Sequence, residues 1–234
     1  MPRATVPELM YGCWRRAWIE FADGSVDDTT MVWWLQTESL MVDVRISVSR
    51  PDLSSRSGLH DCTLAELRTI AAEDASSGFT ECCPVVAGVN GARQATASWN
   101  TSSGVNFQPV SAFPEPGLMT WNDDATVMME YAPSGAYVEE WRLVPGSRDS
   151  LLTRFDGLAA LYRAGDIAVY VRDRVIPIPR TARLVDLVDE YAEDRAVVES
   201  LLDCEFSVAE RAGSDWFITA STLPWRQGEL LDVG

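Results

Sequence analysis

Two charged residues in the first quarter of the chain are spaced so that they could act together on a ligand. Asp43 and Arg45 lie two residues apart in the alternating segment 40–48, and side chains two apart in a strand share one face. A guanidinium can hold a carboxylate in a bidentate pair, which suits recognition of a polar ligand. On an outer face, the same pair would be an ordinary solvated surface feature. We treat Arg45 as a candidate ligand-binding residue and Asp43 as a candidate catalytic acid or base.

A second group of candidates combines carboxylates with aromatic side chains in the segments 126–131 and 136–144. Glu139 and Glu140 are consecutive, so they must point to opposite faces of a strand, and one of them points inward. An inward carboxylate beside Trp141 would have a raised pKa, because burial disfavours its charge, and it could serve as a general acid or base. The alternative is a structural carboxylate paired with an arginine. The two segments supply the candidate catalytic residues Glu139 and Glu130 and the candidate ligand contacts Tyr131 and Trp141.

Tryptophan and amide side chains recur in two further segments. The first segment is the run at 32–37, and the second spans 99–108. Indole N–H and amide groups can orient a small polar molecule without taking part in chemistry, while the rings supply apolar walls. The candidate ligand-binding residues from these segments are Trp33, Trp34, Gln36, Trp99, Asn106 and Gln108.

The composition excludes several kinds of chemistry. All 19 basic residues are arginines, so the chain has no lysine for a Schiff base or a phosphate-binding loop. With a single histidine, His60, the chain cannot build a histidine-rich metal site, and we predict neither a metal nor a cofactor. A net charge of -16 disfavours binding to nucleic acids and to anionic membranes.

Cysteine content and hydropathy bear on location. The five cysteines are odd in number and irregular in spacing, which is typical of reduced thiols rather than of a disulfide framework. No apolar stretch resembles a signal peptide or approaches the roughly 18 residues that span a membrane. We therefore expect a cytoplasmic protein, and the sequence leaves open whether it forms a homo-oligomer.

Alternating apolar residues and tight-turn signals predict roughly a dozen short strands. They also predict two helices: one over about 63–76, opened by the capping box Thr63-Leu64-Ala65-Glu66, and a long amphipathic one over about 182–202. Strands joined by short turns favour a mainly β fold with an antiparallel barrel over a parallel sheet. Pro145-Gly146-Ser147 divides a barrel region at 1–145 from a second β-rich region at 146–234 that holds the long helix. We expect the two regions to pack as one unit.

Gly12-Cys13-Trp14 opens the first expected strand and resembles the Gly-x-Trp signature of the lipocalins and the wider calycin group. In that group the glycine lets the chain bend and the tryptophan plugs the floor of the barrel. The resemblance implies a lipocalin-like or calycin-like barrel, or two fused half-barrels, with the two helices as insertions. Alternation predicts that one face of this strand carries Trp14, Arg16, Trp18 and Glu20. This face is either a barrel plug, with Arg16 stacked on an indole, or a ligand floor that contains an ion pair.

Further segments resemble a group of uncharacterised bacterial two-part barrel proteins. They are Val32–Thr37, Asp43–Ile46, Trp99 with Phe107-Gln108-Pro109, Asp203–Phe206 and Ser221–Trp225. The group has Trp-His-Arg and Asp-Phe-Gln-Pro where this chain has Trp99-Asn100-Thr101 and Asn106-Phe107-Gln108-Pro109, so a site that used that histidine or aspartate is altered here. The chain is also distantly similar to a yeast protein with two lipocalin-like halves. The resemblance implies the fold over nearly the whole chain and carries no activity with it.

Three functions fit these features. The first is binding of a small organic molecule in an aromatic-lined barrel cavity. The alternative is a cofactor-free enzyme (a lyase, hydratase, isomerase or cyclase) that uses Asp/Glu acid–base chemistry on a small organic substrate, with Arg45 as an electrostatic clamp. The third is an interaction protein whose barrel is filled and whose surface carries an apolar patch. An open interior would separate the first two from the third.

Overall fold

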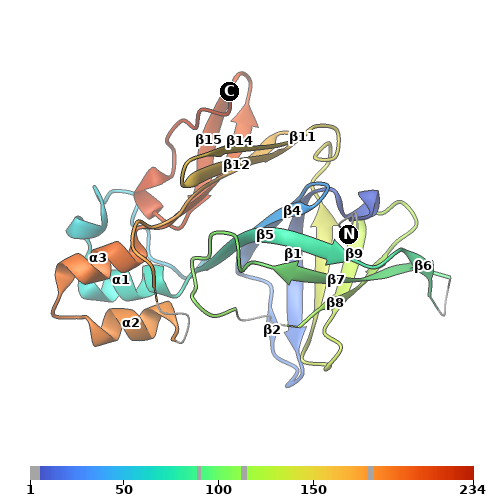
Figure 1. Ribbon diagram of the computed structural model, residues 1–234, viewed down its shortest axis with the longest axis horizontal. Coiled ribbons are helices and arrows are strands. Elements are labelled where there is room, and N and C mark those ends of the chain that lie inside the picture. The colour runs from blue at the N-terminus through green and yellow to red at the C-terminus, as the bar shows by residue number, and fades with distance from the viewer. Residues whose placement is uncertain (1–5, 89–90, 112–114, 179–181) are drawn as a thin grey trace.

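The computed structural model describes residues 6–88, 91–111, 115–178 and 182–234. Over these ranges the chain has the mainly β fold that its sequence predicts, with three α-helices instead of two. Eight of the described strands form a closed antiparallel barrel, and five others form a separate antiparallel sheet (Figure 1).

The barrel strands pair in the order β1, β3, β4, β5, β7, β8, β9 and β10, and β10 closes the ring by pairing with β1. Closure leaves no open strand edge in the ring. The bounds are Gly12–Phe21 (β1), Met31–Gln36 (β3), Leu40–Ile46 (β4), Asp74–Cys82 (β5), Arg93–Asn100 (β7), Gly117–Trp121 (β8), Val127–Tyr131 (β9) and Tyr137–Leu143 (β10). Two short strands outside the ring, β2 (Val26–Asp27) and β6 (Val86–Ala87), pair with β1 and β7.

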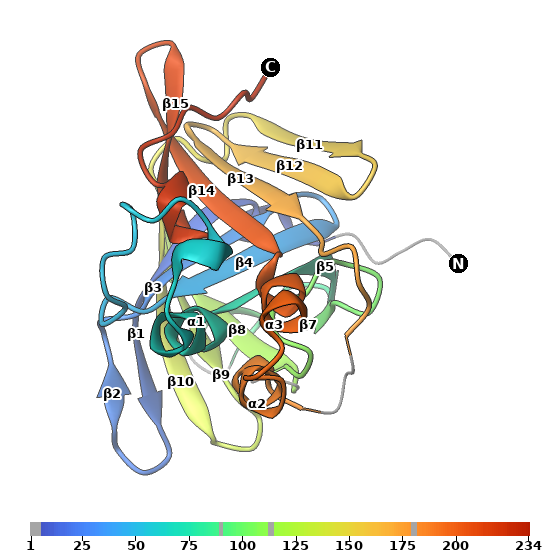
Figure 2. The ribbon, with the colours of Figure 1, turned by 90° about the vertical axis from the view of Figure 1, so that its left-hand side faces the viewer.

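The second sheet follows the chain in simple order from β11 to β15. Its strands are Leu151–Asp156 (β11), Ala159–Ala164 (β12), Ile167–Arg172 (β13), Glu205–Ala212 (β14) and Asp215–Ser221 (β15). Between β13 and β14 lie α2 (Leu184–Glu190) and α3 (Arg195–Leu202), and α1 (Leu64–Ala71) from the β4–β5 connection packs beside them (Figures 1 and 2). Three short 3-10 helices complete the fold: η1 (Glu8–Met10), η2 (Leu59–Asp61) and η3 (Pro224–Arg226).

The largest hydrophobic core lies outside the barrel. It forms where the outer face of β3 and β4 meets the second sheet and the three helices. The barrel contributes Trp33, Leu35, Val42, Val44 and Ile46; the sheet contributes Tyr162, Val169, Val171, Phe206 and Val208; the helices contribute Leu67, Ile70, Leu187 and Leu201. Because both faces of β3 and β4 are covered, apolar residues occur on both sides of these strands.

One end of the barrel interior is filled. Trp14 is fully buried there, its Nε1 donates to the carbonyl of Met10 at 2.8 Å, and the guanidinium of Arg148 lies 5.4 Å above its ring. Arg148, rather than the predicted Arg16, is therefore the cation over this indole. Gly12 has a φ of 107°, and a Cβ there would lie 2.8 Å from Oγ of Ser147, which itself accepts the amide of Cys13 at 2.9 Å. The position requires glycine both for its backbone conformation and for space.

The prediction that Trp14, Arg16, Trp18 and Glu20 share one face of β1 is wrong beyond Arg16. The register between β1 and β10 shifts between Arg16 and Trp18, which is the signature of a β-bulge. Trp14 and Arg16 point into the barrel, whereas Trp18 donates from its Nε1 to Glu140 at 3.3 Å and Glu20 is exposed. The shift brings Ile19 into the buried interior in their place.

Both predicted helices differ from the observed ones. The helix at 63–76 has the predicted capping box at Thr63 and Glu66, but it ends at Ala71, where the helical spacing of apolar residues stops. The helix at 182–202 is broken into α2 and α3, because Asp194 caps the second one by accepting the amide of Val197 at 3.2 Å. Within the described residues, no helix is both long and apolar enough to cross a membrane.

Candidate functional site

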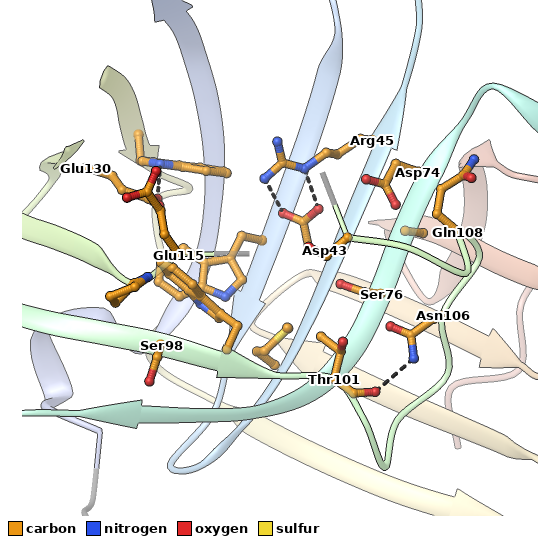
Figure 3. A pocket seen from close by; sticks show the side chains of 17 residues that line it. Asp43, Arg45, Asp74, Ser76, Ser98, Thr101, Asn106, Gln108, Glu115 and Glu130 are labelled. Atoms are coloured by element: carbon orange, nitrogen blue, oxygen red, sulfur yellow. Dashed lines mark hydrogen bonds and ion pairs between the residues drawn. The ribbon is translucent and has the colours of Figure 1, made fainter. Parts of the chain in front are cut away.

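The open half of the barrel contains a cavity of about 310 Å³. Its wall comes from β3, β4, β5, β7, β9 and β10, and from residues 101–111 and 115–116 of the connection between β7 and β8 (Figure 3). Aromatic, hydroxyl, amide and charged side chains all contribute to this wall. The cavity therefore combines apolar surface with several polar groups, as small-molecule sites do.

Eight of the twelve predicted site residues line this cavity. They come from six different segments of the chain, which the barrel brings together: Trp34, Asp43, Arg45, Trp99, Asn106, Gln108, Glu130 and Trp141.

The other four predicted residues lie elsewhere. Trp33 points out of the barrel into the large core, with the guanidinium of Arg15 4.9 Å above its ring. Tyr131 is 41% exposed. Both are sequence neighbours of lining residues and must face the opposite way. Two residues are buried in the interior without lining the cavity: Gln36, which accepts from Oγ1 of Thr80 at 2.6 Å, and Glu139.

Charged residues form a continuous chain of ion pairs that runs from β2 into the barrel interior. Asp27 pairs with Arg16 at 2.6 Å, Arg16 with Glu139 at 3.2 Å, Glu139 with Arg45 at 3.6 Å, and Arg45 with Asp43 at 2.7 Å. Burial opposes the charge of Arg45, yet Asp43 and Glu139 together raise its pKa above the ordinary value. The guanidinium is thus held by two carboxylates of the chain itself.

Glu130 and Glu139 are direct partners across β9 and β10. Burial raises the pKa of Glu130 to about 8, with a further contribution from the negative charge of Glu139. Burial also raises the pKa of Glu139, but Arg45 and Arg16 oppose that shift. Two adjacent carboxylates share protons, and the guanidiniums favour charge on Glu139. At neutral pH the proton therefore lies on Glu130, whose oxygens accept from the Tyr137 hydroxyl at 3.2 Å and from Nε1 of Trp141 at 3.1 Å.

Asp74 is a lining carboxylate that the sequence reasoning missed. It is the register partner of Arg45 across β4 and β5, and it lies beside Arg45 in Figure 3. Burial raises its pKa to about 6, although Arg45 lowers it. Assigning 63–76 to a helix concealed Asp74 and its neighbour Ser76, which also lines the cavity. The sequence does carry a signal for the end of the helix, because apolar residues no longer follow helical spacing after Ala71.

Three tryptophans form a cluster in the cavity wall. Trp34 packs edge-to-face against Trp99, with centroids 6.0 Å apart, and against Trp141 at 5.8 Å. Such geometry is favourable for aromatic pairs. Trp34 is 2% exposed, and its Nε1 has no hydrogen-bond partner among the described residues.

The side-chain amides of Asn106 and Gln108 hold in place the loop that lines the cavity after β7. Nδ2 of Asn106 donates to the carbonyl of Thr101 at 2.8 Å, which closes the loop after β7 (Figure 3). Nε2 of Gln108 donates to the carbonyl of Ala71 at 2.8 Å, and its Oε1 accepts the amide of Leu184 at 3.1 Å. Gln108 therefore ties the loop to the end of α1 and the start of α2.

The raised carboxyl pKa values predict that the fold loses stability as pH rises. Burial raises the pKa of Glu73 to about 7, so Asp74, Glu73 and Glu130 all titrate above their ordinary values of 3.8 to 4.5. Between about pH 5 and pH 8 the folded protein holds protons that the unfolded chain has released, so the free energy of unfolding falls with pH. We expect a falling melting temperature over this range, measured by circular dichroism, and a smaller fall above pH 7 for Glu130→Gln. A melting temperature that rises from pH 5 to pH 8 would contradict the protonated state of Glu130.

No protein-family model, curated protein or solved structure matches this chain. Among the described residues, no group of three or more His, Cys, Asp or Glu side chains is arranged to hold a metal ion. The geometry defines the chain as a closed antiparallel barrel with a cavity lined by tryptophans and carboxylates, joined through a common core to a second sheet.

Proposed function

We propose that this protein binds a small organic molecule in the cavity of its barrel. The observation that carries the proposal is the contrast between the two ends of the interior. One end is filled by Trp14 and its neighbours, whereas the other is open and lined by three tryptophans and several charged groups. A volume of about 310 Å³ is at the lower end of the roughly 300–1,000 Å³ of small-molecule sites, which favours a compact ligand.

We also propose that the barrel is lipocalin-like. Three observations support this: the closed antiparallel ring, the positive φ of Gly12, and the buried Trp14 beneath Arg148. They agree with what the Gly-x-Trp resemblance implies for the first strand. The assignment concerns the architecture and does not specify the ligand.

Tryptophan fluorescence tests the binding proposal, because three of the nine indoles line the cavity. We expect a saturable change in emission with at least one compound from a panel of small cationic, neutral and anionic molecules. Trp34→Phe should diminish the change, since it alters the central ring of the cluster. Trp225→Phe is the matched control, because Trp225 lies against the large core outside the barrel. Absence of a saturable response across the whole panel would overturn the proposal.

A second candidate function is acid–base catalysis, and one specific observation favours it. Glu130 and Asp74 line the same cavity with pKa values of about 8 and about 6, so one is protonated and the other largely ionised at neutral pH. Carboxyl groups whose pKa values are held apart in this way can act as a general acid and a general base. An enzyme would convert the compound that saturates the fluorescence change, whereas a binding protein would return it unchanged. Mass spectrometry distinguishes the two.

A further inference from the structure

The cavity has an excess of negative charge. Among the described lining residues, four are acidic (Asp43, Asp74, Glu115 and Glu130) and one is basic, Arg45. The guanidinium of Arg45 is already bound between Asp43 and Glu139, so it adds little attraction for an anion. A chain with a net charge of -16 also favours the approach of cations over that of anions.

The aromatic cluster meets this acidic wall at Glu130. Nε1 of Trp141 donates to Glu130 Oε2 at 3.1 Å. A Cβ on Gly117 would lie 2.8 Å both from Glu130 Oε1 and from the tip of the Trp99 ring, so carboxylate and ring converge on one point. Indole rings attract cations through their π faces, most strongly in desolvated surroundings, and a carboxylate beside them adds to that attraction.

We propose that the cavity takes a small organic ammonium ion, with the ammonium group between the tryptophan cluster and Glu130. This inference rests on the proposed function and names its ligand class. The ligand's charge offsets the negative charge of the wall.

Binding of a cation should also displace the proton from Glu130. The groups that face this carboxyl are Glu139, Tyr137 and Trp141 from β10 and Arg45 from β4, while its neighbours on β8, Gly117 and Met119, carry no charge. A cation stabilises the ionised form, so it binds more tightly once Glu130 is deprotonated. The affinity should rise between pH 6.5 and pH 8.5, by at most about tenfold per pH unit below the pKa.

The test compares ammonium ions with neutral isosteres in which carbon replaces nitrogen. The pairs are choline with dimethylbutanol and tyramine with propylphenol, titrated by fluorescence and by calorimetry. We expect at least one ammonium ion to bind roughly 5- to 30-fold more tightly than its isostere, which corresponds to about 1–2 kcal/mol of cation–π attraction. Glu130→Gln should reduce this preference and remove the pH dependence above about pH 7, where Asp74 is already largely ionised. Glu140→Gln is the matched control, because Glu140 lies on the outside of the barrel beside Trp18.

The outcomes separate the inference from the proposed function. If the neutral isosteres or anionic compounds of the panel bind as tightly as the ammonium ions, the cavity is a ligand site but the ammonium assignment is wrong. If no compound of any class binds, the proposed function itself fails. If Glu130→Gln does not fold, the pH dependence of the wild-type affinity tests the role of Glu130 instead. An affinity that is flat or falls with rising pH would contradict that role.

Discussion

Arg45→Met is expected to lower the free energy of unfolding by about 3–5 kcal/mol, because it leaves buried charges without their partner. Arg45 joins Asp43 at 2.7 Å to Glu139 at 3.6 Å, and the Glu139 side chain is 1% exposed. Methionine matches the length of the arginine stem but offers no charge. The carboxylates must then take up protons or draw water into the interior. Urea denaturation followed by circular dichroism measures the loss.

The matched control is Arg142→Met in β10. Arg142 pairs with Glu140 at 2.8 Å on the outer face, and its side chain is 67% exposed. An exposed pair of this kind contributes about 1 kcal/mol or less. Adding Asp43→Asn to Arg45→Met should recover part of the loss, because it removes one of the stranded charges. If Arg45→Met destabilised no more than Arg142→Met, the ion-pair chain would not hold the barrel interior together.

Gly117→Val is expected to weaken ligand binding by roughly tenfold or more while leaving the barrel folded. The first added carbon would lie 2.8 Å from Glu130 Oε1 and from the Trp99 ring, closer than real contacts allow. Carboxyl and ring must therefore move into the space that the ligand needs. We expect the affinity of any ligand found by fluorescence titration to fall by roughly tenfold or more, a loss of at least about 1.4 kcal/mol. Overpacking should cost about 1–3 kcal/mol of stability.

Thr120→Val provides the comparison for this variant. Thr120 is in the same strand but points to the outer face, since β8 alternates with buried residues at 117, 119 and 121. The substitution keeps the shape of the side chain and should leave the affinity unchanged. Unaltered binding in a folded Gly117→Val protein would place the ligand somewhere other than this cavity.

The location of the main core explains how the barrel can hold charges. In a free-standing barrel, the interior must supply most of the buried apolar surface. Here the outer face of β3 and β4 is buried instead, against the second sheet and the helices. The same strands can therefore place Trp34, Asp43 and Arg45 inside without depriving the fold of its hydrophobic stabilisation.

Strand periodicity was sufficient to group most of the site residues. The spacing of Asp43 and Arg45 placed them correctly on one face, and the sequence of hairpins indicated an antiparallel barrel. Periodicity alone does not say which face is inside when both faces of a strand are apolar. That ambiguity is why Trp33 and Trp34 were both candidates, although only Trp34 lines the cavity.

The remaining features depend on contacts between distant segments. The β-bulge in β1 arises from its pairing with β10, more than a hundred residues away, and alternation within β1 carries no trace of it. The observed helix ends at Ala71, five residues before the predicted end at 76, because a capping box fixes the start of a helix but not its end. Alternation indicates that one of Glu139 and Glu140 points inward, but it does not identify the partners of Glu139. Arg16 and Arg45 come from strands that meet Glu139 only in the closed ring.

If the open end of the barrel is a ligand site, a crystal structure of the protein with a bound compound will locate that compound there. Crystals would be grown with the compound that gives the strongest saturable fluorescence change. The predicted result is electron density for that compound between the tryptophan cluster, Glu130 and Asp74. A cavity filled by the protein's own side chains, or density for the compound only outside the barrel, would show that the open end of the barrel is not a ligand site.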